Sequence, residues 1–163
     1  MLRETSSVQT LGPDGTGESL AHAVASATSR RLAAAAEQDM RARYDLGRTL
    51  RSIREGSCRA DSFLDAVAQA LAVHPSLLRR YIRVATLIAP SQFEAFASLR
   101  DPRGMPLTWS HVEHLADVRS KTQRTLIAEE AVAQSLSVRA LRLQIRRVRA
   151  ANAANPLPAL VEA

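Results

Sequence analysis

Apolar residues recur every three or four positions along most of this chain, the spacing that places them on one face of an α-helix. The longest such pattern follows Ser29, which can cap a helix, and runs to Gly56, which can end one. Runs in which apolar and polar residues alternate, as they do in β-strands, are few. The pattern therefore predicts an all-α fold, whose longest helix has the apolar face Leu32, Ala36, Met40, Tyr44, Gly47, Leu50 and Ile53.

Six shorter helices are predicted after residue 60, each with a residue suited to a helix start. Asp, Ser and Thr side chains accept hydrogen bonds from the first free N–H groups of a helix, and Pro is favoured in its first turn. In chain order these starts are Asp61, Pro75, Pro90, Thr108, Ser120 and Ser137. The first of these helices has the predicted buried side Phe63, Leu64, Val67, Ala68 and Leu71. The last has the apolar stripe Val138, Leu141, Ile145 and Val148.

Composition divides the chain into three parts. Residues 1–28 are rich in Ser, Thr and Gly and predict a flexible arm, with residues 18–29 as a frayed helical lead-in. Residues 29–150 carry the helical pattern, and residues 151–163 form a loose tail with two prolines. A length of 163 residues suits a single domain. We therefore expect one multi-helix domain at 29–150, flanked by an arm and a tail.

Basic residues are concentrated in two segments. The net charge is +6, and residues 30–60 carry eight Arg against four acidic residues, while residues 137–163 carry five Arg against one. Clustered arginines favour nucleic acid because they displace counterions from phosphates. Solvated helix faces or a GC-rich genome would give the same composition. The arginines predicted to contact phosphate from these segments are Arg48, Arg51, Arg142, Arg146 and Arg149.

The segment VAQALAVHPSLLRRYIRV, residues 67–84, has the pattern of a helix-turn-helix. Apolar residues occupy the inner positions of both helices, and the turn lies just before Pro75. In such a motif the second helix enters the major groove, where an arginine can bind guanine through two hydrogen bonds. A pair of packed helices with solvated arginines is the alternative. The residues predicted to face DNA are His74, Ser76, Arg79, Arg80 and Arg83.

The segment VAQALAVHPSLLRRYIRVATLI resembles the helix-turn-helix of the ParB/KorB/Noc family of partition and repressor proteins. The likeness continues over residues 107–148. Trp109-Ser110-His111, Ser137–Leu141 and the Tyr44-x-x-Gly47 helix are similar to the N-terminal helical domain of bacterial restriction-nuclease-fold proteins. Together the likeness covers about residues 40–150. It implies DNA binding through Ser76, Arg79, Arg80 and Arg83.

The sequence departs from these families in ways that limit what the resemblance implies. The usual glycine of the helix-turn-helix turn is Ala72, so the turn must avoid a positive φ or tolerate strain. Nothing in residues 1–60 resembles the nucleotide-binding module of the partition family, and only thirteen residues follow residue 150. CTP binding, clamp sliding and nuclease activity are therefore not implied.

Other candidate sites are more simply explained by structural roles. His111, His114 and Asp117 have a spacing that can hold a metal, but a buried His111 beside a core Trp109 accounts for them. Cys58 is expected to be a non-reactive thiol. The adjacent residues Glu129 and Glu130 point apart on a helix, so they do not form an acid–base pair. With no nucleophile signature, we expect no enzyme, no cofactor and no metal site.

The sequence therefore predicts a non-enzymatic DNA-binding protein of the partition or repressor type, acting on double-stranded DNA as a homodimer or higher homo-oligomer. With a single cysteine and no apolar run that reaches bilayer length, we expect a cytoplasmic, nucleoid- or plasmid-associated protein without a membrane span. The alternative class is a protein-interaction or assembly module, accessory to a larger complex, in which the arginines meet an acidic protein partner. RNA binding is a weaker third option because aromatic residues that could stack on bases are scarce.

Overall fold

Seven α-helices and no β-strand make up the part of the chain that the computed structural model describes, residues 14–55 and 60–154. The predicted all-α class is confirmed. No helix within these ranges has the length and apolar character needed to cross a membrane. The helices are α1 Asp14–Glu55, α2 Ala60–Ala70, α3 Pro75–Leu87, α4 Pro90–Ser98, α5 Trp109–Leu115, α6 Lys121–Ala133 and α7 Val138–Ala154.

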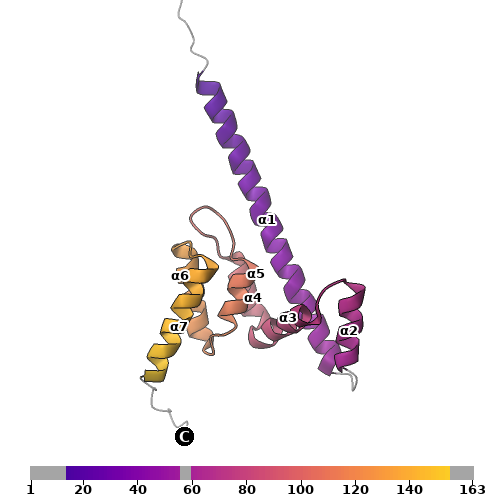
Figure 1. Cartoon of the computed structure of the whole chain (residues 1–163). Helices are drawn as coiled ribbons and strands as arrows, with labels where there is room; N and C mark the ends of the chain where they lie inside the picture. Colours follow the sequence, from indigo (N-terminus) through magenta and orange to yellow (C-terminus); the bar gives the residue numbers. More distant parts are fainter. Residues whose placement is uncertain (1–13, 56–59, 155–163) are drawn as a thin grey trace, which may run out of the picture.

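Helix α1 is longer than predicted, because it begins at Asp14 and not at Ser29. Half of the predicted arm is therefore helical, and the alanine-rich stretch before Ser29 has the helix propensity to account for this. Figure 1 shows the N-terminal half of α1 extending well beyond the other helices. The predicted apolar face is buried only over its middle. Leu32 is 59% exposed and Ile53 40% exposed, whereas Met40, Tyr44 and Leu50 are fully buried.

The central packing contact is the crossing of α1 and α3, to which the Tyr44-x-x-Gly47 pattern contributes directly. Tyr44 stacks on Phe93 with ring centroids 3.8 Å apart, and its hydroxyl donates to the Ile88 carbonyl at 2.7 Å. A Cβ built on Gly47 would lie 2.4 Å from the carbonyl oxygen of Tyr81. The absence of a side chain at Gly47 is therefore what allows the two helix backbones to approach each other.

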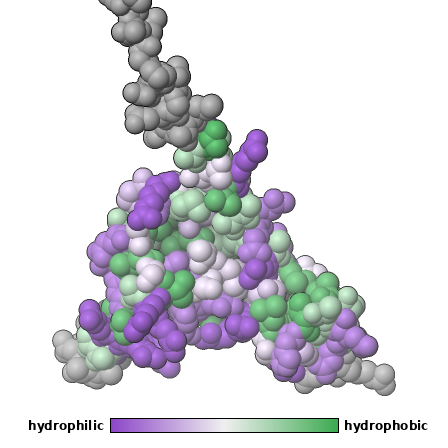
Figure 2. All heavy atoms as spheres, turned by 45° about the horizontal axis from the view of Figure 1, so that its top comes forward, coloured by the Kyte–Doolittle hydropathy of each residue, from purple (hydrophilic) through white to green (hydrophobic). Residues whose placement is uncertain are grey.

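Helices α2 and α3 form the predicted helix-turn-helix arrangement, joined by the four residues 71–74. The turn is closed by backbone hydrogen bonds, among them Val73 N–H to the Ala68 carbonyl at 2.9 Å. Leu64 and Ala68 are buried as predicted, but Leu71 is 49% exposed because it lies in the turn, beyond the end of α2. Asp61 lies inside α2 and does not precede it. Figure 2 shows hydrophobic residues gathered over the corner of the molecule where α2 lies.

The turn contains Ala72 at φ 52°, in the left-handed region that favours glycine. The strain anticipated from the missing glycine is therefore present. An alanine in this conformation costs about 1–2 kcal/mol. We expect Ala72→Gly to raise the free energy of unfolding by about 1 kcal/mol, measured by urea titration. Ala66→Gly, at an exposed position inside α2, is the matched control and should lower the same quantity by about 1 kcal/mol. If Ala72→Gly lowered the free energy of unfolding, the backbone at Ala72 would not be strained.

Several predicted helix starts are confirmed by their hydrogen bonds. Pro75 opens α3, and Ser120 Oγ accepts from the N–H of Gln123 at 3.3 Å at the start of α6. Ser137 Oγ accepts from the N–H of Ala140 at 3.2 Å before α7. Thr108 is the N-cap of α5. These caps fix where α5, α6 and α7 begin.

Candidate nucleic-acid interface

One face of α3 is open to solvent and carries the predicted DNA-facing side chains. Tyr81, Ile82 and Ala85 are buried on the opposite side, whereas the basic residues of the helix are exposed. His74 is the N-cap, and its Nδ1 accepts the N–H of Ser76 at 3.2 Å and lies 2.8 Å from Ser76 Oγ. His74 and Ser76 therefore fix the start of the helix while both remain exposed.

The three arginines of α3 differ in their partners. Arg79 has no hydrogen-bond or ion-pair partner among the residues that the structure describes. Arg80 lies 3.9 Å from Glu113, and Arg83 pairs with Asp117. Glu113 is on α5 and Asp117 lies two residues beyond the end of that helix, so the two carboxylates form two successive ion-pair contacts with α3. Sequence reasoning missed both carboxylates, although their i, i+4 spacing is visible in the sequence.

Helix α5 holds Glu113 in place through its core contacts. Trp109 is only 5% exposed, in agreement with the predicted core role, and its ring meets Tyr81 edge-on with centroids 5.1 Å apart. The indole N–H of Trp109 donates to Glu113 Oε1 at 2.7 Å. The Arg80–Glu113 contact is therefore anchored to the buried face of α3 through Tyr81.

The arginines of α7 meet this surface at Asp117. Arg149 donates to the Asp117 carbonyl oxygen, while the Asp117 side chain pairs with Arg83 and lies 3.9 Å from His114. Arg142, Arg146 and Arg149 line a recess of about 200 Å³ with His114 and Asp117. The fold thus brings Arg83 of α3 and the three predicted arginines of α7 to one place.

Arg48 and Arg51 do not join this group. Arg51 pairs with Glu55 at 2.7 Å and approaches the Ala85 carbonyl at 3.4 Å. Both arginines line a shallow depression beside Pro90. Because Ala85 lies on the buried side of α3, these two residues are behind the helix and away from Arg79. A single phosphate clamp made of both basic segments is therefore not what the fold assembles.

Two other arginines of the first basic segment, Arg41 and Arg43, are paired with carboxylates. Arg41 contacts Glu37 and Glu94, and these hydrogen bonds raise the pKa of its guanidinium. Arg43 contacts Asp39 at 2.9 Å and lies 5.9 Å from the centroid of the Tyr81 ring. Much of the positive charge of α1 is therefore neutralised locally.

Arg124 is the buried charge that sequence reasoning missed. Its side chain is 5% exposed and donates to the carbonyl oxygens of Val118 and Leu87 and to Gln92 Oε1, each at 2.8 Å. Burial lowers the pKa of its guanidinium. The Leu87 carbonyl is at the C-terminal end of α3, so Arg124 also complements the negative end of that helix dipole. No local sequence signal separates this arginine from the exposed ones.

His111 is buried as predicted, and both of its ring nitrogens have structural partners. Nδ1 accepts the backbone N–H of Thr108 at 3.2 Å, and Nε2 lies 3.0 Å from the Leu136 carbonyl. This arrangement requires the neutral tautomer with the proton on Nε2. Within the described ranges no three His, Cys, Asp or Glu residues are grouped as a metal site would require. Cys58 lies outside those ranges.

The His111 contacts predict how stability depends on pH. Burial, opposed by the Leu136 hydrogen bond and assisted by nearby His114, lowers the pKa of His111 below its ordinary value. As the pH falls, His111 therefore takes up a proton in the unfolded chain before it does so in the folded chain. The stability that neutral His111 contributes is fully present above about pH 6.5 and is lost as the pH falls through the folded-state pKa. We expect the melting temperature to fall between pH 7.5 and 5. His111→Gln should flatten the profile and His74→Gln should not; equal slopes in wild type and His111→Gln would refute this.

Comparisons of the chain with protein-family models, with curated proteins and with solved structures return no match.

Proposed function

We propose that the chain is a non-enzymatic DNA-binding protein of the partition or repressor type, with α3 as its recognition helix. The observation that carries this proposal is the open face of α3. On this face Arg79 has no partner among the described residues, and Arg80 and Arg83 are exposed beside it. The turn before Pro75 has four residues, a length typical of the helix-turn-helix motif, and this supports the proposal.

The contacts divide between bases and phosphates. Residues near the start of a recognition helix reach base edges, which assigns base contacts to His74, Ser76 and Arg79. A guanidinium can bind guanine O6 and N7 together. Arg83 and the α7 arginines bind the flanking phosphates, which orient the helix without reading sequence. Two copies of the chain then read two half-sites about one helical turn apart.

The test is fluorescence anisotropy with a labelled 30-base-pair duplex, taken from random DNA by selection for binding, over a series of salt concentrations. Arg79→Ala should weaken binding to the selected duplex about 10-fold or more. Arg146→Ala should weaken binding to selected and random duplexes alike and lower the salt slope by about one. The matched control is Arg147→Ala, because Arg147 is the exposed neighbour of Arg146 and does not line the α7 recess.

Two outcomes would overturn the proposal. One is binding that does not change with salt concentration. The other is an affinity loss in Arg147→Ala equal to the losses in Arg79→Ala and Arg146→Ala, since that would show a dependence on net charge alone.

A protein-assembly module is the second candidate, and the apolar corner at α2 favours it. Leu71 is 49% exposed there, and Phe63 and Val67 are only partly buried. Apolar patches of this kind are typical of interaction surfaces. The 260/280 nm absorbance ratio before nuclease treatment, together with light scattering, separates the two classes. The assembly module is favoured if the purified protein carries no nucleic acid and if added DNA does not change its self-assembly.

A further inference from the structure

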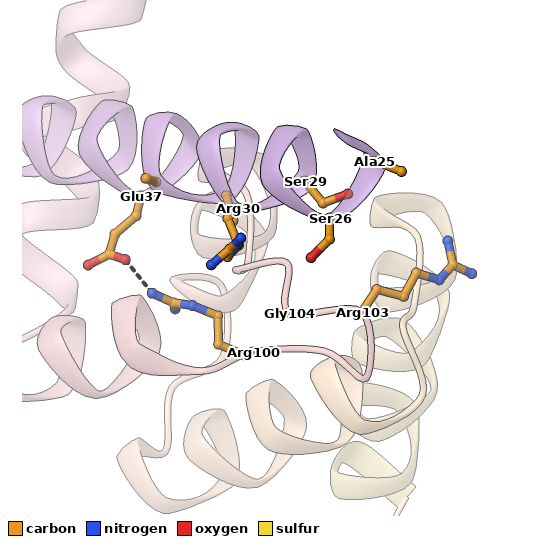
Figure 3. A pocket seen from close by; sticks show the side chains of 10 residues that line it. Ala25, Ser26, Ser29, Arg30, Glu37, Arg100, Arg103 and Gly104 are labelled. Atoms are coloured by element: carbon orange, nitrogen blue, oxygen red, sulfur yellow. Dashed lines mark hydrogen bonds and ion pairs between the residues drawn. The ribbon is translucent and has the colours of Figure 1, made fainter. Parts of the chain in front are cut away.

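A cleft of about 560 Å³ separates the N-terminal half of α1 from the turn between α4 and α5. Figure 3 shows side chains of α1 directed toward this turn across the cleft. The space exists because the lining residues include small ones from both sides. They are Ala25, Ala33, Ala34 and Gly104.

The turn is held rigid by its own hydrogen bonds. Asp101 Oδ1 accepts the backbone N–H groups of Arg103 at 2.9 Å and Met105 at 2.8 Å. Gly104 has φ 78°, and its N–H donates to the Asp101 carbonyl at 2.8 Å. Asp101 Oδ1 is therefore held by the turn backbone, while Oδ2 accepts from Ser135 Oγ at 3.4 Å, and the position of Arg103 is set by this turn.

The acidic side chain in the cleft is already neutralised. Glu37 pairs with Arg100 from across the cleft and with Arg41 on its own helix. Arg100 Nη1 also donates to the carbonyls of Ala97 at 2.6 Å and Leu99 at 2.8 Å. The Glu37–Arg100 pair thus joins helix and turn, and it neutralises the acidic residue among the described residues that line the cleft.

Two other arginines of the cleft remain available. Arg30 and Arg103 are exposed, and their guanidinium groups have no partner among the residues that the structure describes. In Figure 3 Arg30 extends from α1 toward the turn, Arg103 extends outward from the turn in the direction away from Arg30, and Ser26 lies between the two side chains in this view. Ser29 also lines the cleft. Two separated guanidinium groups with hydroxyls between them match an anion whose charge is spread over more than one phosphate.

We propose that this cleft binds a small oligophosphate, with Arg30 and Arg103 each holding one phosphate and Ser26 donating between them. The volume is in the range of small-molecule sites. None of the lining residues belongs to α3, α5 or α7. The site is therefore independent of the proposed DNA-binding face, and either proposal can fail without the other.

The test is isothermal titration of the full chain with inorganic pyrophosphate at physiological salt. We expect saturable one-to-one binding that Arg30→Ala and Arg103→Ala each weaken about 10-fold or more. Arg31→Ala is the matched control, since Arg31 is the exposed neighbour of Arg30 and does not line the cleft; it should change the affinity less than 2-fold. An absence of saturable binding, or equal losses in Arg30→Ala and Arg31→Ala, would overturn the proposal.

A second variant tests the shape of the site without removing charge. Ala34→Leu places a larger side chain at a lining position that is exposed, so it should block pyrophosphate while leaving the melting temperature unchanged. If Ala34→Leu bound pyrophosphate as tightly as wild type, pyrophosphate would have to bind outside the cleft. Displacement of pyrophosphate by duplex DNA would also overturn the small-ligand assignment, because the cleft would then be part of a nucleic-acid surface.

Discussion

Replacing Gly47 by alanine is expected to lower the free energy of unfolding by about 3 kcal/mol, although alanine is the better helix former. The added Cβ would lie 2.4 Å from the Tyr81 carbonyl oxygen and 2.7 Å from its carbonyl carbon. Both atoms belong to the backbone of α3, which cannot rotate away as a side chain could. The helices must therefore separate, and that weakens the Tyr44–Phe93 stack beside the crossing.

Urea unfolding followed by circular dichroism measures this effect. Ser52→Ala is the control, because Ser52 is an exposed position on the same helix where alanine adds helix propensity without a clash. It should be neutral or raise stability by a few tenths of a kcal/mol. If Gly47→Ala raised the free energy of unfolding, the helix propensity of alanine would outweigh the clash at the crossing, and α1 and α3 would lie further apart.

The parts of the fold that sequence reasoning predicted correctly depend on few neighbouring residues. The helix starts at Pro75, Ser120 and Ser137 need only a suitable residue and the following turn, so they are visible locally. The exposure of Leu32 and Ile53 was not visible, because the periodicity of a helix says which residues share a face and not where a partner covers it. The crossing of α3 covers only the middle of that face.

The candidate interface shows the same division. The exposed row of α3 follows from the turn and the helical period, so its arginines could be named in advance. Their pairing with Glu113 and Asp117 could not, because it depends on how α5 packs across α3. For the same reason the equal charge of the two basic segments gave no sign that Arg48 and Arg51 lie behind α3.

Replacing Arg124 by methionine is expected to lower the free energy of unfolding by about 3–5 kcal/mol. Methionine fills a similar volume, so the loss comes from the hydrogen bonds and not from a cavity. The Val118 and Leu87 carbonyls and Gln92 Oε1 would each lose a charged donor. Gln92 in turn donates to the Lys121 carbonyl and to Thr125, so its position is expected to loosen as well.

Thermal and urea unfolding measure the stability of Arg124→Met and of the control Arg119→Met, which removes an exposed arginine nearby. The comparison separates the loss of buried hydrogen bonds from the loss of a positive charge. The control should change stability by less than about 0.5 kcal/mol. Arg124→Lys keeps the charge but lacks the planar guanidinium group, so its free energy of unfolding should remain well below that of wild type. If Arg124→Lys were as stable as wild type, the charge at the end of α3 would be sufficient and the three-way hydrogen bonding would not be needed. Because Arg124 bonds the last residue of α3, Arg124→Met should also speed amide exchange over the final turn of that helix, while the turn at Ala72 stays protected.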